Sequence, residues 1–405
     1  MTKRLYYQNS YLKEFRAKVL KKIKIDNQPA VVLGETAFYP TSGGQPYDKG
    51  LIQNIPVVEV LEDNNEIIHI LKEELKEKIN SEVVGKIDWK RRFDHMQQHL
   101  GQHILSGALM KLWGVETVSF HLGEEVCTLD IAKEELTEEE AKKAEECANE
   151  IIFDNRPVKC YFVEGEEELK GLNLRKVLEK TGKIRIIEVE DFDFSACGGT
   201  HCRATGEVGL IKITKWEKRG EKIHLEFICG RRAWKDYFWK NEVIKNISNK
   251  LTIKDSELRE AINRMLEERK EIRKELKEFK EKLQDYEVRN LINESSLKDD
   301  GIKIISKIFE DKNFQEVTEL VQKIINLDES VVVLFGIKDK GAKILFACSR
   351  ALKYDMNKLI REAGKFIEGR GGGAPNFAQA GGKRAEGIED ALNFALEHFQ
   401  EFIKK

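Results

Sequence analysis

Three histidines recur at a spacing of four residues in the stretch Asp94-His-Met-Gln-Gln-His-Leu-Gly-Gln-His103. On an α-helix this spacing places His95, His99 and His103 on one face. An i, i+4 pair of imidazoles is an arrangement that allows two side chains to bind one zinc ion. A metal site needs further ligands from elsewhere in the chain.

Those ligands are offered by the stretch Ser195-Ala-Cys-Gly-Gly-Thr-His201, whose two glycines allow Cys197 and His201 to fold around one point. Each half alone is more often an ordinary surface or core motif than a metal site, but one site explains both halves together. The prediction is one tetrahedral zinc per chain, bound by His95, His99, Cys197 and His201. His103, two turns from His95, is assigned a role beside the metal or in a substrate pocket.

Two other chemistries are less favoured. A zinc metalloprotease of the H-E-x-x-H type is excluded because Met96 stands where the glutamate base would be. Cys197 as a nucleophile remains an alternative, but a zinc-bound thiolate loses nucleophilicity, and the sequence marks out no Asn or Asp as the orienting third residue.

The apolar pattern predicts the elements that hold these residues. A helix is expected over 94–112 and strands over 115–120 and 126–131, followed by a helix that opens at Thr137 with Glu140 as a capping box. Strands over 210–214 and 223–228 complete an α/β zinc domain at residues 91–230. His121, which follows the first of these strands, is a candidate pocket residue, and a core or surface role is equally open.

Residues 1–90 are predicted to form a β-barrel, because apolar or alternating runs at 30–33, 57–61 and 67–71 are divided by turn residues. Between the runs lies Phe38-Tyr-Pro-Thr-Ser-Gly-Gly-Gln-Pro-Tyr-Asp-Lys-Gly50. Its simplest interpretation is a barrel turn.

Residues 231–298 are predicted to form a helical hairpin or coiled coil. An apolar seam steps by four and three residues with one Arg interruption, and the alternative is a solvated helix without a partner. The seam comprises Leu258, Ile262, Met265, Arg269, Ile272, Leu276, Phe279, Leu283 and Tyr286.

Residues 299–405 are predicted to form a C-terminal α/β domain. Strands are expected at 303–308, 331–336 and 344–349, and helices at 314–325, 356–367 and 384–403. The stretch Gly369–Gly382 is rich in glycine. It is interpreted as a phosphate-binding loop at a helix start, with a flexible linker as the alternative.

Composition limits the classes of protein that fit. The 405 residues carry 69 Lys+Arg against 71 Asp+Glu, so only a local patch favours nucleic acid, and 350–384 has eight bases against three acids. The seven cysteines are odd in number and indicate reduced thiols. With no apolar run of ~18 residues, the chain is expected to be soluble and cytoplasmic, with an α+β multidomain fold.

Taken in order, the glycine-rich stretch 38–50, the paired histidines, the Cys-Gly-Gly-Thr-His motif and the stretch 369–382 resemble the editing and C-terminal parts of alanyl-tRNA synthetase. The resemblance covers nearly the whole chain and lacks the large aminoacylating half. The sequence is therefore similar to the long form of the free-standing AlaX-type editing proteins, whose C-terminal domain is of the DHHA1 type.

This resemblance implies zinc-dependent hydrolysis of serine, and sometimes glycine, from tRNA(Ala). By motif, His95, His99, Cys197 and His201 match the zinc ligands, Thr41 matches a position associated with the serine hydroxyl, and Gln45 belongs to the same motif. It also implies tRNA binding and dimer contacts by the C-terminal domain, for which the candidates are Arg361, Lys365, Arg370, Lys383 and Arg384. The alternative function is a non-catalytic tRNA-binding or assembly module with a structural zinc.

Overall fold

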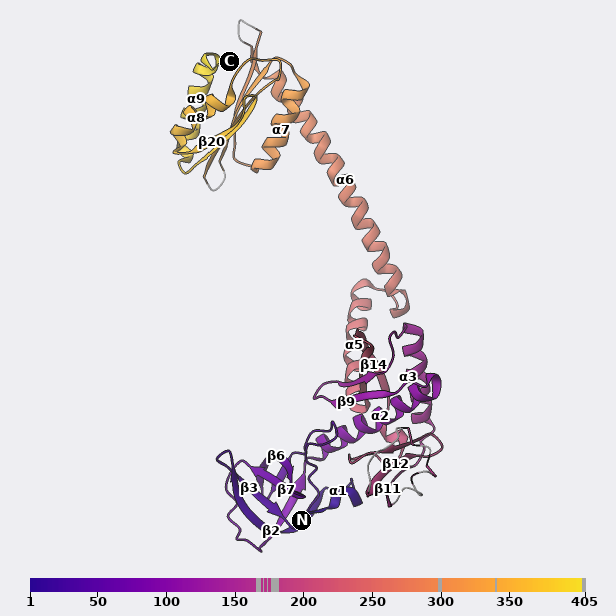
Figure 1. Cartoon of the computed structure of the whole chain (residues 1–405). Helices are drawn as coiled ribbons and strands as arrows, with labels where there is room; N and C mark the ends of the chain where they lie inside the picture. Colours follow the sequence, from indigo (N-terminus) through magenta and orange to yellow (C-terminus); the bar gives the residue numbers. More distant parts are fainter. Residues whose placement is uncertain are drawn as a thin grey trace. The chain divides into compact units, whose positions relative to one another are not determined.

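The computed structural model describes residues 1–164, 169, 171–172, 174–175, 182–297, 301–338 and 341–402. The chain forms two compact units, Met1–Asp255 and Ser256–Lys405 (Figure 1). Within the described residues, no helix is long and apolar enough to cross a membrane.

The first unit begins with a closed barrel of six strands in the order β2-β3-β7-β6-β5-β8. Three of its hairpins turn on residue pairs in which both members have positive φ, namely Asp26-Asn27, Gln53-Asn54 and Asn64-Asn65. Such two-residue turns match the twist of antiparallel strands. The strands are β2 (Glu14–Ile25), β3 (Gln28–Leu33), β5 (Gly50–Ile52), β6 (Ile55–Asp63), β7 (Glu66–Leu71) and β8 (Glu82–Ile87).

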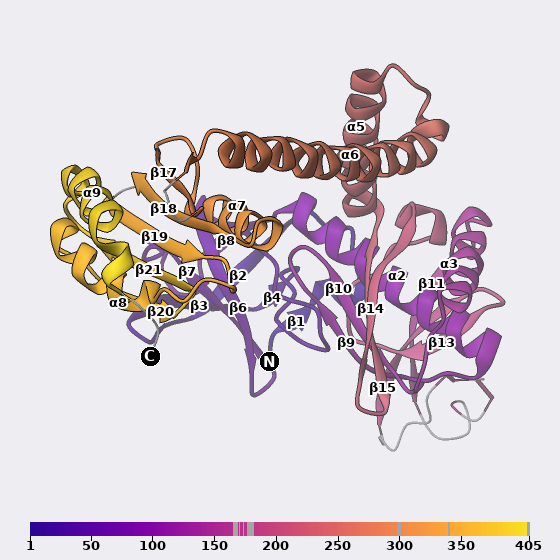
Figure 2. The ribbon, with the colours of Figure 1, turned by 90° about the horizontal axis from the view of Figure 1, so that it is seen from above.

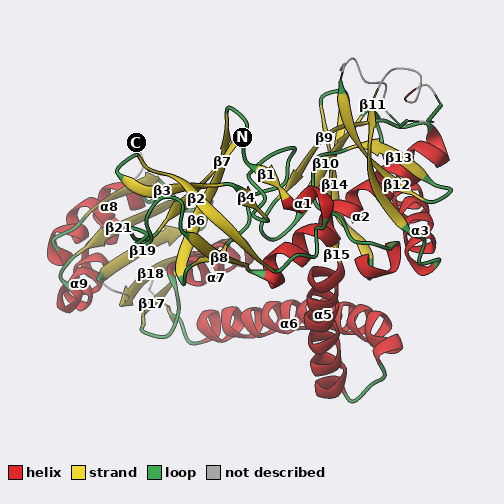
Figure 3. Ribbon diagram, turned by 90° about the horizontal axis from the view of Figure 1, so that it is seen from below, coloured by secondary structure: helices red, strands yellow, loops and turns green. Residues whose placement is uncertain are grey.

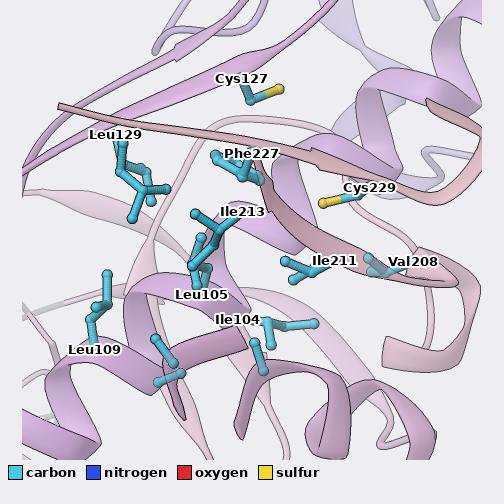
Figure 4. Packing of buried hydrophobic residues seen from close by; sticks show 14 of the residues in the cluster. Ile104, Leu105, Leu109, Cys127, Leu129, Val208, Ile211, Ile213, Phe227 and Cys229 are labelled. Atoms are coloured by element: carbon cyan, nitrogen blue, oxygen red, sulfur yellow. The ribbon is translucent and has the colours of Figure 1, made fainter. Parts of the chain in front are cut away.

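Helix α2 (Trp89–Trp113) follows the barrel and packs on a four-stranded sheet in the order β14-β15-β10-β9 (Figure 4). Asp88 caps its start and Gly114, with φ 67°, ends it. The strands are β9 (Thr117–Leu122), β10 (Cys127–Ile131), β14 (Ile211–Arg219) and β15 (Lys222–Cys229). The core between helix and sheet includes Ile104, Leu105, Leu129, Ile213 and Phe227.

Helix α3 (Glu138–Phe153) packs against α2 in the same core. The predicted capping box is confirmed, because Thr137 Oγ1 accepts from the Glu140 amide at 3.2 Å and the Glu140 carboxylate accepts from the Thr137 amide at 2.9 Å. A three-stranded sheet, β11 (Val158–Glu164), β12 (Lys183–Val189) and β13 (Asp193–Ala196), follows and was not predicted. Its last strand delivers the chain directly to Cys197.

Two long helices lie where the hairpin was predicted. Helix α5 (Gly230–Leu251) ends the first unit and α6 (Leu258–Asn293) begins the second. The end of α6 packs in the core of the second unit through Val288 and Leu291. Further toward its start, the apolar seam residues from Ile262 to Leu283 are 42 to 71% exposed, so pairing of this seam remains a prediction.

The second unit is a three-layer α/β domain around a sheet in the order β16-β17-β18-β19-β21-β20. Helix α7 (Phe314–Leu327) and the end of α6 cover one face, and α8 (Met356–Ala363) and α9 (Ile388–His398) cover the other (Figure 2). The strands are β16 (Ser296–Leu297), β17 (Lys303–Phe309), β18 (Val331–Lys338), β19 (Ala342–Cys348), β20 (Arg370–Ala374) and β21 (Phe377–Gly382). The helix expected at 384–403 is shorter, and Ile403 lies outside the described residues.

The prediction of a phosphate-binding loop at Gly369–Gly382 is wrong. This stretch is the β20–β21 hairpin, which pairs through β21 with β19 (Figure 3). Its glycines are required by close packing, since a Cβ on Gly371 would lie 2.2 Å from the Gln379 carbonyl oxygen and one on Gly373 would lie 2.4 Å from that of Phe377. Small residues permit a strand here, whereas the glycine-rich composition by itself indicates a loop.

Candidate metal centre and substrate cavity

Four side chains converge where α2 meets the chain segment after β13. One ligand atom from each of His99, His103, Cys197 and His201 lies within 4.8 Å of the others. Cys197 Sγ is 3.3 Å from His99 Nε2 and 3.6 Å from His201 Nε2. The three imidazoles are almost completely buried.

The prediction that His95 is a ligand is corrected by this geometry, and His103 takes its place. Each four-residue step rotates a helix by about 40° beyond a full turn and advances about 6 Å. The loop at Cys197–His201 can therefore meet only two consecutive histidines of the three. It meets the pair at 99 and 103, while His95 faces a separate cavity at the start of α2.

The loop between Cys197 and His201 is shaped by tight contacts with the histidine pair. A Cβ on Gly199 would lie 2.2 Å from His99 Cε1, so only glycine fits beneath that ring. The Arg185 guanidinium donates to the carbonyl oxygens of Cys197 and Gly199 at 2.9 and 2.8 Å. Arg185 thereby fixes the backbone that presents the thiol.

Gln45, from the glycine-rich stretch, contacts the cluster directly. Its Oε1 accepts from His99 Nδ1 at 2.9 Å and from the Thr200 amide at 3.1 Å, while its Nε2 donates to Thr200 Oγ1 at 2.9 Å. Since His99 carries its proton on Nδ1, the Nε2 lone pair faces the cluster. Such a bond on the far nitrogen orients a metal-ligating histidine.

The rest of the glycine-rich stretch is anchored on both sides. A Cβ on Gly44, whose φ is 80°, would lie 2.6 Å from the Phe120 carbonyl oxygen, and the Gly44 carbonyl accepts from the Leu122 amide at 3.0 Å. The Asp48 carboxylate pairs with the buried Arg92 of α2, whose Nε donates at 2.9 Å. The barrel turn is thus a structural bridge between β9 and α2.

Burial sets the protonation of the cluster. Loss of hydration, with a smaller contribution from Arg185, lowers the pKa of His99 to about 3. Burial also brings the pKa values of His103 and His201 well below their usual range and raises the pKa of the Cys197 thiol. Neutral imidazoles are the form that binds metals, whereas the thiol must lose its proton on binding.

The donor set fits zinc. Two ligand atoms on a tetrahedral zinc with bonds of about 2.0 to 2.3 Å are about 3.3 to 3.8 Å apart, and both sulfur–nitrogen distances fall in this range. Within the described chain, His103 Nε2 is buried and has no hydrogen-bond partner. A cation at the centre of the four groups would satisfy that orphaned atom.

His103 is held by residues that the sequence did not mark out. Arg175 donates to the His103 carbonyl at 2.9 Å, its other terminal nitrogen is 3.3 Å from His103 Nδ1, and Asp193 Oδ2 is 3.8 Å from the same Nδ1. When Nε2 ligates a metal, the proton is on Nδ1, which then cannot accept from Arg175; Asp193 Oδ2, at 3.8 Å, becomes its acceptor after a small shift of the side chains. Neither residue belongs to a local motif, so no sequence signal pointed to them.

A cavity of about 250 Å³ opens beside the cluster, and three of the four clustered residues, His99, His103 and Cys197, contribute to its wall. The remaining wall comes from the barrel turn, α2, β9, β13 and Arg175. It includes Gly43, Gln102, Met110, Glu116, Thr117, Val118, Ser119, Phe120, Arg175, Ser195 and Ala196. The centre is therefore exposed to a small, partly polar cavity and is not enclosed on all sides.

Three predicted pocket residues, Thr41, Gln45 and His121, do not line this cavity, and of these Gln45 contacts the metal cluster instead. Thr41 is exposed, and its Oγ1 accepts from the Tyr47 amide at 3.2 Å. His121 is exposed on β9, one residue beyond Phe120. The wall also carries the hydroxyl residues Thr117, Ser119 and Ser195. Of these, Thr117 has its Oγ1 2.6 Å from Ser106 Oγ.

Three segments of the chain match models of domain families found in tRNA synthetases. Residues 184–224 match the threonyl and alanyl tRNA synthetase second additional domain, residues 301–405 match the DHHA1 domain, and residues 3–91 match the class II (A) tRNA synthetases. The fold and site thus define a synthetase-type editing module joined to a DHHA1 domain.

Relatives of the whole chain define the family more narrowly. The alanyl-tRNA editing protein AlaX-L of Pyrococcus horikoshii is 30% identical over 100% of both chains. The chain belongs to this AlaX-L family. The alanine–tRNA ligase of Pyrococcus furiosus is 33% identical over 96% of this chain, which spans 43% of the ligase. The solved C-Ala domain of the Aquifex aeolicus alanyl-tRNA synthetase aligns with 26% of this chain and 95% of its own length, at 23% identity and a TM-score of 0.24.

Proposed function

We propose that this chain is a zinc-dependent aminoacyl-tRNA deacylase that hydrolyses Ser-tRNA(Ala), with Gly-tRNA(Ala) as a second substrate. The observation that carries the proposal is the cavity whose wall includes His99, His103 and Cys197. A small cavity that reaches the donor set gives a small aminoacyl group access to it.

The site would act on an ester that is already activated. When bound, zinc supplies positive charge that can orient the substrate's amino group or polarise an oxygen. The protein positions the donors: Gln45 orients His99, Arg185 fixes the loop at Cys197, and Arg175 and Asp193 hold His103. The wall residues Gln102 and Thr117 are linked through the buried Ser106, whose Oγ accepts from Gln102 Nε2 at 2.9 Å and lies 2.6 Å from Thr117 Oγ1.

Selection against alanine follows from unpaired polar groups. A site that hydrogen-bonds the serine hydroxyl leaves its own groups unpaired when alanine enters, and such sites reach rejection of ~10⁴-fold. Glycine also lacks the hydroxyl, so Gly-tRNA(Ala) is expected to react more slowly than Ser-tRNA(Ala). Measuring hydrolysis of seryl- and alanyl-tRNA(Ala) by the purified chain tests the proposal, with fast release from the first and slow release from the second expected.

The second candidate is a tRNA-binding or assembly module with a structural zinc. Four protein donors are typical of closed structural sites. The cavity beside the donors favours the enzyme, because a metal that only stabilises the fold does not need a cavity through which a substrate can reach it. Zinc content without hydrolysis of either aminoacyl-tRNA would favour the module.

Two threonines are candidates for binding the serine hydroxyl, and substituting each in turn shows which of them contributes. Thr41→Val removes a hydroxyl whose bond to the Tyr47 amide is internal to the turn, and Thr117→Val removes one in the cavity wall. A neutral hydrogen bond contributes about 0.5 to 1.5 kcal/mol, or roughly 2- to 13-fold. We expect the seryl-tRNA rate to fall within this range for the threonine that binds substrate. Equal rates for parent and both variants would assign recognition to another group.

The C-terminal domain is proposed to bind tRNA through bases on its surface. Arg361, Lys365, Arg370, Lys383 and Arg384 are all exposed. Lys365 is paired with Glu362, so the other four are the stronger candidates for phosphate contacts. They lie on α8, on β20 and after β21.

The exposed seam of α6 is proposed to pair with a second copy of the chain. We expect the parent to sediment as a dimer and Ile272→Asp/Leu276→Asp as a monomer, because burying two carboxylates in a seam costs several kcal/mol. The matched control is Lys274→Asp/Glu278→Asp, which changes the charge equally on the other face of the helix. An unchanged mass for the seam variant in analytical ultracentrifugation would show that the seam is solvated.

A further inference from the structure

His95 is left without a role once His103 completes the metal centre. Its side chain is 2% exposed, and within the described residues its Nδ1 has no hydrogen-bond partner. The ring contributes to the wall of a second cavity, of about 360 Å³, formed by the first turns of α2 and α5 and the turn after β9. A buried polar atom without a partner at a cavity wall calls for a ligand.

The charges around this cavity favour an anion. Its lining combines five bases, Lys90, Arg91, Arg231, Arg232 and Lys235, with three carboxylates, Asp88, Asp94 and Glu124. Two of the carboxylates are already engaged: Asp94 accepts from Arg232 at 2.6 Å, and Asp88 caps α2 by accepting from the Arg91 amide at 3.2 Å. Glu124 is the remaining acid.

Three of the bases are available. Lys90, Arg231 and Lys235 are exposed, and in the described parts of the chain none of them forms an ion pair. Arg231 and Lys235 lie one turn apart on α5, so both heads can reach one ligand at the cavity mouth.

The start of α5 adds a backbone donor. This 22-residue helix has no side-chain cap at Cys229. The amides of Cys229, Gly230 and Arg231 are bonded to Gln98 Oε1, the Leu210 carbonyl and Gln97 Oε1, which leaves the amide of Arg232 as the donor of the first turn without an intrahelical partner. The positive end of a long helix attracts phosphate, and the Arg232 amide can donate to it.

We propose that this cavity binds a phosphate group of the tRNA backbone, with His95, Arg231, Lys235 and the first turn of α5 as its contacts. The polynucleotide assignment rests on the proposed function and on the next residues of α5. Trp234, Tyr237 and Phe238 are 61, 64 and 55% exposed beside these bases. Bases interleaved with exposed aromatic rings are typical of surfaces that bind a nucleic-acid backbone and stack on its bases.

The test compares Arg231→Gln/Lys235→Gln with Lys245→Gln/Lys250→Gln, which removes the same charge farther along the same helix. Binding of deacylated tRNA(Ala) is measured at several salt concentrations, and binding of inorganic phosphate is measured by calorimetry. We expect the first variant alone to bind tRNA about tenfold more weakly, to lower the magnitude of the salt slope by about one to two, and to lose phosphate binding.

Equal tRNA affinities and salt slopes for the two variants would overturn the proposal. Loss of inorganic phosphate binding with unchanged tRNA binding would overturn the tRNA assignment and identify a site for a free phosphate compound. If the parent binds phosphate at this site but neither binds nor hydrolyses tRNA, the proposed function fails while the anion site stands.

Discussion

His103→Ala is expected to abolish zinc binding and to lower seryl-tRNA(Ala) hydrolysis by ~10³-fold, whereas His95→Ala is expected to retain the metal. The reason is geometric, since His103, and not His95, shares a centre with His99, Cys197 and His201. Loss of several kcal/mol of electrostatic stabilisation by a metal corresponds to a rate loss of this order.

Elemental analysis and single-turnover deacylation of the purified variants check this result. Cys197→Ala serves as the positive control, because it removes a donor that both ligand sets contain and should lose zinc and activity together. Zinc loss in His95→Ala with full zinc in His103→Ala would restore the ligand set predicted from the sequence. Full activity of any metal-free variant would contradict a role for zinc in hydrolysis.

The choice between His95 and His103 shows where sequence reasoning ends. The four-residue spacing correctly placed three histidines on one helix, but both consecutive pairs have the same local geometry. Only the position of the Cys197–His201 loop selects the pair, and that position depends on β12 and β13 and on Gln45 from a distant segment of the chain. Tertiary contacts of this kind leave no periodicity in the sequence.

Elements with strong local signals were predicted well. The capping box at Thr137, the long helices and strands β17, β18 and β19 of the C-terminal sheet fall at or near their expected residues. The prediction for residues 369–382 was wrong because glycine is a poor strand former in general. Here strand formation is imposed by pairing with β19. Arg175 and Arg185 were missed because isolated arginines carry no pattern.

Neutralising four exposed bases of the C-terminal domain is expected to cause the second large effect. We predict that Arg361→Gln/Arg370→Gln/Lys383→Gln/Arg384→Gln weakens binding of deacylated tRNA(Ala) by about tenfold at ~0.1 M salt for each phosphate interaction that the substitutions remove. Each removal should also lower the magnitude of the negative slope of log K against log salt by about 0.9. The physical cause is that fewer counterions are released from the tRNA on binding. All four side chains are exposed, so the fold should persist.

A barrel variant with four exposed lysines replaced, Lys18→Gln/Lys72→Gln/Lys76→Gln/Lys78→Gln, provides the matched control. It changes the net charge equally, so a uniform electrostatic effect would weaken both variants alike, whereas a local binding surface would weaken only the C-terminal one. Hydrolysis at saturating seryl-tRNA(Ala) should be retained in both, because neither set lies in the cavity wall. Equal affinities and salt slopes for the two variants would mean that the C-terminal bases are only a solvated surface and that tRNA binds through the first unit.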